Sequence, residues 1–379
     1  MSPIEVQQIT QATAAASLKD QAQTQLKVQP LKRNHLLDVY KSFKVQPHIG
    51  SEFEKGIQLR ELLNAPNSSE LFHDLAVYVA ERNVIFFRDQ DLTFEEMKEV
   101  ADRLGKAGGK PATSGLHSHP ISVDTDEFGE KNFPISSKLV IQRDTAYGGG
   151  RTEFSSKEWH SDITFENVPS DYAVLRLREG PPAGGDTLWA SAYEVYERLS
   201  PAFQKFLEGL TATHSGDGFL KLAELGLATI NPGPRGAPED VGTHLTAVHP
   251  VIRTNPVTGW KGVFANKGFT RRINELSKDE SDLVLNHLFQ LSVQNHDLQV
   301  RFRWNKNDVA VWDNRSAYHA ATVDFDFEEY IRLGERAASL GERPYYDSAS
   351  KSRREALGLA PPVSRRAHLA SLSAAAERN

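Results

Sequence analysis

The sequence contains no cysteine among its 379 residues. This absence excludes disulfide bonds, zinc–thiolate sites, iron–sulfur clusters and a cysteine nucleophile. A metal ion bound by this protein must therefore take nitrogen and oxygen ligands, which histidine and the acidic side chains supply.

Long apolar runs are also missing, and no stretch approaches the roughly 18 consecutive apolar residues that a membrane-spanning helix needs. Residues 1–35 lack the basic start, apolar core and small-residue cleavage site of a secretory signal. We expect a flexible N-terminal arm over 1–35, one domain over 36–348 and a C-terminal tail over 349–379. The predicted location is cytoplasmic.

The chain also lacks an excess of positive charge. Its formal net charge is -6 and its isoelectric point is near 6.1, which argues against nucleic acid or an anionic membrane as the main partner. The prediction is a small-molecule substrate, with homo-oligomerisation left open.

Short strand-like runs alternate with a few capped helices along the chain. Helices are predicted over 69–82 after Ser68, over 94–105 between a Thr93–Glu96 capping box and a stop at Gly105, after a Ser191–Glu194 capping box, from Ser200-Pro201 onward, and over 278–295 behind a Ser277–Glu280 capping box. Strand-like runs are "NVIFFRDQ", "SKLVIQRD", "DYAVLRLR", "DTLWA", "LQVRFRW", "DVAVWD" and "YIRLGERAASL". Long loops at 106–136 and 214–246 interrupt them, so we expect one barrel-like α+β domain.

The segment "SSKEWHSDITFE" (residues 155–166) places an imidazole and a carboxylate two positions apart in a run that we interpret as a strand. In a strand, His160 and Asp162 share one face. They would then form two of the three ligands of a non-haem Fe(II) facial triad. A chance pair in contact with water remains the alternative, because the pattern is short.

Polar residues downstream extend this pattern. Thr187 follows a Gly-Gly turn, and His319 lies in "DNRSAYHAA". Arg332 and Arg336 share a face if "YIRLGERAASL" is extended. Inside a barrel they would need anionic partners, whereas on an exposed strand they would face solvent.

Several longer motifs now resemble the TauD/TfdA family of Fe(II)- and 2-oxoglutarate-dependent dioxygenases, and most closely its fungal members. They are "VIFFRDQDL", "WHSDITF", "GGDTLWAS", "LSPAFQKFLEGLTATHS", "HPVIRTNPVTGWKGVFANKGFTRRI" and "VAVWDNRSAYHAA", spread over about residues 45–345. The resemblance implies a double-stranded β-helix (jelly-roll) core with flanking helices and long loop insertions.

The resemblance also implies roles for individual residues. His160, Asp162 and His319 match the iron ligands. Thr187 and Arg332 match the pair that binds the distal carboxylate of 2-oxoglutarate, and Arg336 matches an arginine beside the substrate and the other carboxylate. With Fe(II), 2-oxoglutarate and O2, such an enzyme oxidises an unactivated C–H bond of a small anionic metabolite, a sulfonate or an amino-acid-like molecule, and releases succinate and CO2.

The substrate is where the sequence departs from the taurine enzymes. Ser156 stands where those enzymes have an amine-contacting asparagine, and Gly109 or Lys110 aligns with their sulfonate-binding histidine. Further substrate-contact candidates are His117, His119, Ile163 and Asn266; Asn266 is equally explained by backbone contacts, and His117 with His119 by a second metal site or a solvent-facing loop. An alternative function keeps the cofactors but performs desaturation or oxidative cyclisation of an amino acid or pathway intermediate in fungal secondary metabolism. A binding protein without turnover and a zinc hydrolase are further alternatives.

Overall fold

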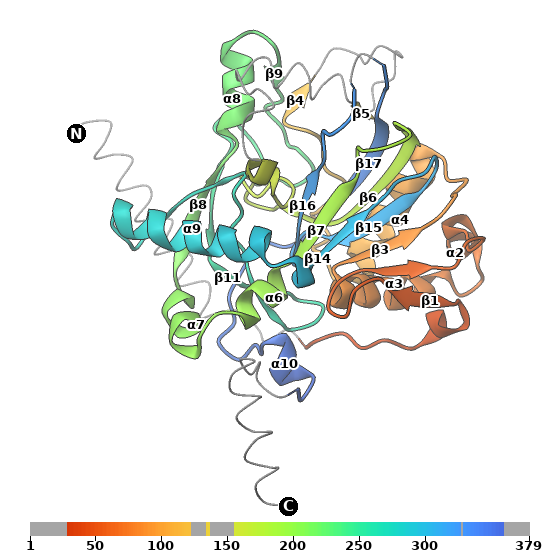
Figure 1. The fold of residues 1–379 in the computed structure, drawn as a ribbon, viewed down its shortest axis with the longest axis horizontal. Helices are drawn as coiled ribbons and strands as arrows, with labels where there is room; N and C mark the ends of the chain where they lie inside the picture. Colours follow the sequence, from red (N-terminus) through yellow and green to blue (C-terminus); the bar gives the residue numbers. More distant parts are fainter. Residues whose placement is uncertain (1–28, 123–133, 137–154, 327–328, 360–379) are drawn as a thin grey trace, which may run out of the picture.

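The computed structural model describes residues 29–122, 134–136, 155–326 and 329–359. Two β-sheets lie against each other at the centre of the fold, and helices cover their outer faces (Figure 1). The larger sheet has the order β1 (Ser42–Lys44), β2 (Ser51–Phe53), β3 (Val84–Phe87), β15 (Val309–Asp313), β6 (Ser170–Glu179), β17 (Leu333–Leu340) and β5 (Pro134–Ser136). The smaller sheet has the order β14 (Gln299–Phe302), β7 (Thr187–Ser191) and β16 (Ala317–Ala321).

Further strands form one three-stranded sheet and two strand pairs outside these two sheets. They are β10 (Thr246–Pro250), β8 (Thr211–Ser215) and β13 (Thr270–Ile273) in one sheet, and the pairs β11 (Ile252–Thr254) with β12 (Lys261–Val263) and β4 (Ile121–Ser122) with β9 (Thr229–Ile230). The helices are η1 (Leu36–Val39), α2 (Leu59–Asn64), α3 (Ser68–Arg82), α4 (Phe94–Ala107), η2 (Ser155–Glu158), α6 (Ala192–Glu197), α7 (Pro201–Leu207), α8 (Asp217–Glu224), α9 (Lys278–Gln294), η3 (His296–Leu298) and α10 (Arg353–Ala356). Within the described ranges, no helix is long and apolar enough to cross a bilayer.

Side chains alternate along the central strands, and this alternation builds the layers. In β15, Val309 and Val311 pack against the cluster formed with α3 and α4, whereas Ala310 and Trp312 lie between the two sheets. Trp189 of β7 meets Trp312 there, with ring centroids 5.9 Å apart. Successive side chains of a strand point to opposite faces of the sheet, and both faces are buried here. Every second residue of these strands therefore lies in the space between the sheets.

The helix predictions are largely confirmed. Both reciprocal capping boxes, at Thr93 and Ser277, are present. Ser191 accepts from the Glu194 backbone N–H, but the return bond of a full capping box is not formed because the Glu194 carboxylate binds Arg353 instead. Gly105 was predicted as a helix stop and this is wrong: α4 continues to Ala107. The glycine serves close packing, since a Cβ there would lie 2.7 Å from the Lys110 Cδ.

The strand predictions hold for β3, β6, β7, β14, β15 and β17. The run 137–144 lies outside the described residues, as do residues 1–28 of the arm predicted over 1–35 and most of the predicted tail. One prediction is wrong: 155–166 is not a strand, because η2 occupies its start and turns follow His160. The loop 214–246 contains α8 and β9.

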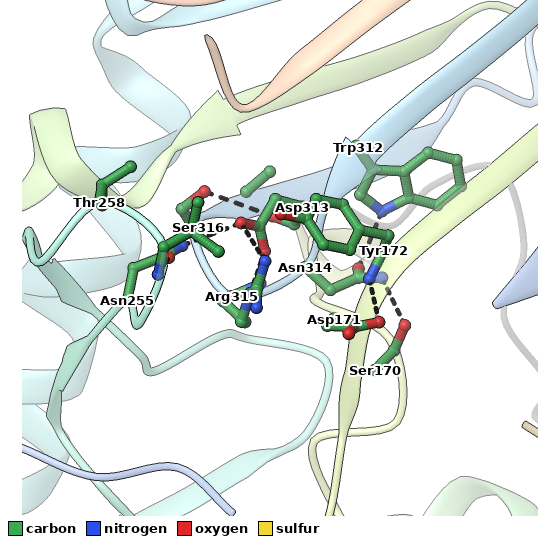
Figure 2. Close-up of polar contacts among 12 residues, drawn as sticks. Ser170, Asp171, Tyr172, Asn255, Thr258, Trp312, Asp313, Asn314, Arg315 and Ser316 are labelled. Atoms are coloured by element: carbon green, nitrogen blue, oxygen red, sulfur yellow. Dashed lines mark hydrogen bonds and ion pairs between the residues drawn. The ribbon is translucent and has the colours of Figure 1, made fainter. Parts of the chain in front are cut away.

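A buried carboxyl at the start of β6 predicts a pH-dependent stability. Burial raises the pKa of Asp171 to about 6, although Arg315 opposes this rise (Figure 2). Because the folded pKa exceeds the unfolded value of 3.8, the stabilising contribution is complete below that value and is lost as the pH rises through 6.

Asp171→Asn is therefore expected to raise the free energy of unfolding at pH 8 by on the order of 2 kcal/mol. The gain should shrink towards zero as the pH falls to about 4, since the wild-type carboxyl is then neutral. Urea unfolding across this pH range measures the effect. A gain of the same size at every pH would contradict the assignment.

Candidate metal centre

Two histidines and one aspartate come together between the sheets. The ligand atoms of His160, Asp162 and His319 lie within 4.8 Å of one another. The Asp162 Oδ1 is 3.8 Å from His160 Nε2 and 3.7 Å from His319 Nε2. These three residues therefore form one cluster, as the sequence predicted.

The histidines converge because their backbones pair directly. His160 and His319 form an isolated antiparallel bridge, with N···O distances of 3.0 Å from His160 N and 2.7 Å from His319 N. Residues opposite each other in such a pair place their side chains on the same face, and the two rings have centroids 4.3 Å apart. The two histidines are thus brought together by this bridge, and not by the continuous strand that the sequence analysis predicted for residues 155–166.

Asp162 reaches the cluster from a turn. The next residue, Ile163, has φ 50° and a buried side chain in a cluster with Phe165 and Leu245. A β-branched residue with positive φ is strained, and such strain is found where a functional geometry is held in place. The turn aims the carboxylate at the histidines.

Electrostatics and burial keep Asp162 and His319 in the protonation states that bind metal. Burial alone would raise the pKa of Asp162, but the charges of Arg336 and the two histidines lower it below its usual range. Burial and the neighbouring His160 lower the pKa of His319 to about 3. An ionised carboxylate and a neutral imidazole are the metal-binding forms.

The residues fit a divalent cation. The Asp162 Oδ2 is buried and has no hydrogen-bond partner in the described part of the chain. An unsatisfied buried acceptor costs about 1–3 kcal/mol or more when charged, and a cation between the three ligand atoms would compensate this cost. Two imidazoles and one carboxylate on one face are the ligand set of non-haem iron oxygenases.

A second pair of predicted residues lies in the same space. Arg332, directly before β17, donates to the Gly185 carbonyl at 2.7 Å and to the Thr187 Oγ1 at 3.1 Å. Trp304 Nε1 donates to the same hydroxyl at 3.0 Å. The predicted Thr187–Arg332 pair is thus in contact, and Gly185 and Trp304 are partners that the sequence did not indicate.

Arg336 faces the metal ligands. It lies on the β17 face that holds Ala338 between the sheets, and its guanidinium forms an ion pair with the Asp162 carboxylate. The alternative of solvent-facing arginines is therefore wrong. Arg332 and Arg336 both point inward.

Three other predicted substrate residues have contacts or positions of their own in the structure. Lys110 does not reach it, because its Nζ binds Asp102 at 2.8 Å and Ser339 Oγ at 3.0 Å on the helix-covered side of β17. Asn266 is buried and its side chain contacts Thr164 and the Phe269 backbone N–H, which supports the backbone-contact reading. Ser156 is half-buried in η2.

The loop that carries His117 and His119 lies near Arg336 and Asp162. The Nε2 of His117 is buried without a hydrogen-bond partner among the described residues. Burial lowers the pKa of His117 well below its usual value, and the nearby charges of Arg336 and Asp162 add smaller, opposing effects. His119 packs on Phe219, with ring centroids 5.3 Å apart. In the described ranges, neither histidine belongs to a cluster of three potential metal ligands, so a second metal site gains no support.

Aromatic rings connect this loop to the metal ligands. Phe219 contacts Phe165, Phe165 contacts Phe269, and Phe269 lies edge-on to His160, with centroid distances of 5.5, 5.0 and 5.6 Å. We call these three phenylalanines the aromatic row. It forms an apolar wall beside the cluster.

Two imidazoles and one carboxylate are the ligand set of iron oxygenases of the facial-triad class, and here a buried arginine–threonine pair accompanies them. A model of the family described as "Taurine catabolism dioxygenase TauD, TfdA family" matches residues 41–337. The chain belongs to this family.

Relatives and solved structures agree with this assignment. The chain is 44% identical over 337 residues to the alpha-ketoglutarate-dependent dioxygenase oryG of Aspergillus oryzae, covering 88% of this chain and 97% of the relative. It is 36% identical to a putative alpha-ketoglutarate-dependent sulfonate dioxygenase of Schizosaccharomyces pombe, covering 86% and 75%. A crystal structure of a putative alpha-ketoglutarate-dependent taurine dioxygenase from Burkholderia xenovorans superposes with a TM-score of 0.60 at 25% identity, covering 80% and 91%. The protein is an Fe(II)- and 2-oxoglutarate-dependent dioxygenase that uses O2.

Proposed function

We propose that His160, Asp162 and His319 hold the Fe(II) ion of this dioxygenase. Thr187 and Arg332 bind the distal carboxylate of 2-oxoglutarate, and Arg336 contacts the substrate and the other carboxylate. The protein then oxidises an unactivated C–H bond of a small anionic metabolite. Three observations support this proposal: the triad forms one cluster, Arg336 forms an ion pair with its aspartate, and the buried Arg332 contacts Thr187.

The two sheets support a finer description of the fold. Their facing inner surfaces, with both arginines and both histidines between them, fit the two layers of a jelly roll. We infer that the β14-β7-β16 sheet and the central strands of the larger sheet form these layers. The functional groups then lie inside the roll rather than on an edge.

Each proposed role follows from the chemistry of its group. Iron with 2-oxoglutarate and O2 supplies oxidative decarboxylation to succinate and CO2 and the oxidation of a C–H bond. Arg332 offers a fixed guanidinium fork and Thr187 a hydroxyl, a combination suited to a carboxylate in a buried place. The aromatic row places an apolar ring edge-on to His160, which reduces the contact of water with that side of the site.

The surroundings favour a substrate with an anionic group and an apolar part. Arg336 supplies positive charge beside the triad, and the aromatic row supplies an apolar wall. The buried His117 Nε2 is a further hydrogen-bonding group, close enough to Arg336 and Asp162 for their charges to act on it. Sulfonates fit this chemistry, and the S. pombe relative carries that substrate class in its name; amino-acid-like anions fit it as well.

A substrate screen tests the proposal. Fe(II)-loaded protein is supplied with 2-oxoglutarate and O2, and succinate release is measured with sulfonates, amino acids and short carboxylic acids, each beside a neutral analogue of the same carbon skeleton. We expect an anionic compound to stimulate release and its neutral analogue to fail. Stimulation by neutral compounds alone would contradict the role of Arg336. Product analysis then distinguishes a hydroxylated product from a desaturated or cyclised one, the alternative outcome.

A further inference from the structure

A buried amide contacts the backbone of the aspartate ligand. The Asn314 Oδ1 accepts from the Asp162 backbone N–H at 3.2 Å and from the Trp312 indole N–H at 2.8 Å. Its Nδ2 donates to Ser170 Oγ at 3.0 Å (Figure 2). Both neighbours of the oxygen are obligate donors, which fixes the orientation of the amide.

The same oxygen also supports a histidine ligand. The indole of Trp312 packs against His319, with ring centroids 5.0 Å apart. The amide of Asn314 therefore holds the backbone of one predicted ligand and the ring that lies against another.

The turn that carries Asn314 is itself fixed. Asp313 and Arg315 are fully buried and form an ion pair, and Asn255 donates to the second oxygen of Asp313 at 2.9 Å. The Asn314 backbone N–H binds the Asp171 carbonyl at 2.7 Å (Figure 2). The buried Asp313–Arg315 ion pair and these hydrogen bonds together restrict the conformational freedom of the turn.

Asp162 needs such an anchor. It lies in a turn rather than in a strand, and Ile163 beside it has a strained positive φ. A backbone segment of this kind keeps its conformation only where its surroundings determine it. The Asn314 Oδ1 accepts from the backbone N–H of Asp162 itself, the residue whose carboxylate belongs to the cluster.

We propose that Asn314 is a positioning residue that sets the orientation of Asp162 for metal binding. The inference rests on the proposed iron site. Groups behind metal ligands typically change metal affinity about 10–100-fold when removed. Asn314 acts through the Oδ1 contact with Asp162, while its contact with Ser170 is secondary.

The test is calorimetric titration of Co(II) alone into the metal-free full chain. We expect Asn314→Leu, which removes the acceptor, to weaken Co(II) binding by about tenfold or more. Ser170→Ala, which removes only the partner of Nδ2 and leaves the Oδ1 contact with Asp162 in place, should stay within about threefold of wild type. Thermal unfolding of the metal-free variants separates loss of affinity from loss of folding.

A second variant keeps the proposal testable if Asn314→Leu does not fold. Asn314→Gln retains both polar groups but displaces them by one methylene, and it should also weaken Co(II) binding. Wild-type affinity in a folded Asn314→Leu or Asn314→Gln variant would overturn the inference, as would an equal loss in Ser170→Ala. If the wild-type chain itself binds no Co(II), the iron site is wrong instead.

Discussion

Asp162→Ala is expected to abolish Fe(II)-dependent succinate formation. The variant removes the one carboxylate of the cluster and leaves two imidazoles with ring centroids 4.3 Å apart, which hold a divalent cation weakly. The loss should exceed the roughly 10–100-fold effect typical of groups that only support a ligand. Succinate release at saturating 2-oxoglutarate, with added Fe(II), measures it.

The matched control is Asp102→Asn. Asp102 is an aspartate of α4 that pairs with Lys110 on the helix-covered side of β17, away from the triad. Turnover should remain close to wild type in this variant. Activity near wild type in Asp162→Ala would remove the aspartate from the metal site.

Arg332→Leu is expected to raise the KM for 2-oxoglutarate far more than the KM for the substrate. Arg332 is buried and contacts Thr187, so a carboxylate bound there would lose its cation in a place with little water. Leaving a buried charge without its partner costs about 3–5 kcal/mol, or roughly two to four orders of magnitude in affinity. Steady-state kinetics with each substrate varied in turn separates the two KM values.

Two variants sharpen this experiment. Arg332→Lys keeps the charge but loses the planar fork, so its KM for 2-oxoglutarate should lie between wild type and Arg332→Leu. Arg303→Leu removes an exposed arginine of the neighbouring segment, whose guanidinium donates to the Pro182 carbonyl, and should leave both KM values unchanged. An unchanged KM for 2-oxoglutarate in Arg332→Leu would place the cosubstrate elsewhere.

The sequence predicted the members of the site better than the geometry that unites them. His160 and Asp162 were assigned to one strand face, but they converge because His160 pairs with His319 and because a turn redirects Asp162. Both causes depend on contacts between distant segments, which local periodicity does not report. The pattern named three residues that do form one cluster, but it was wrong about the strand.

Local signals succeeded where local physics decides the outcome. The capping boxes at Thr93 and Ser277 formed as predicted because the bonds join residues three apart. Gly105 was read as a stop, yet it is a point of close packing between α4 and β17. This role of Gly105 depends on its contact with Ser339 of β17, which the local sequence around Gly105 does not indicate.

Side-chain partners from other segments were also out of reach. Lys110 aligned with a substrate position, but Asp102 and Ser339 hold it on the far side of β17. Asn314 lay inside a recognised motif with no assigned role, and its contact with Asp162 spans 152 residues. Such pairs become visible only once the sheets are assembled.

Calorimetric titration of 2-oxoglutarate into the anaerobic, Fe(II)-loaded full chain tests the central claim most directly. The account predicts one binding site per chain that is lost when the metal is removed and in Asp162→Ala loaded in the same way. Binding of 2-oxoglutarate that is equally tight with and without Fe(II), and unchanged in Asp162→Ala, would contradict it.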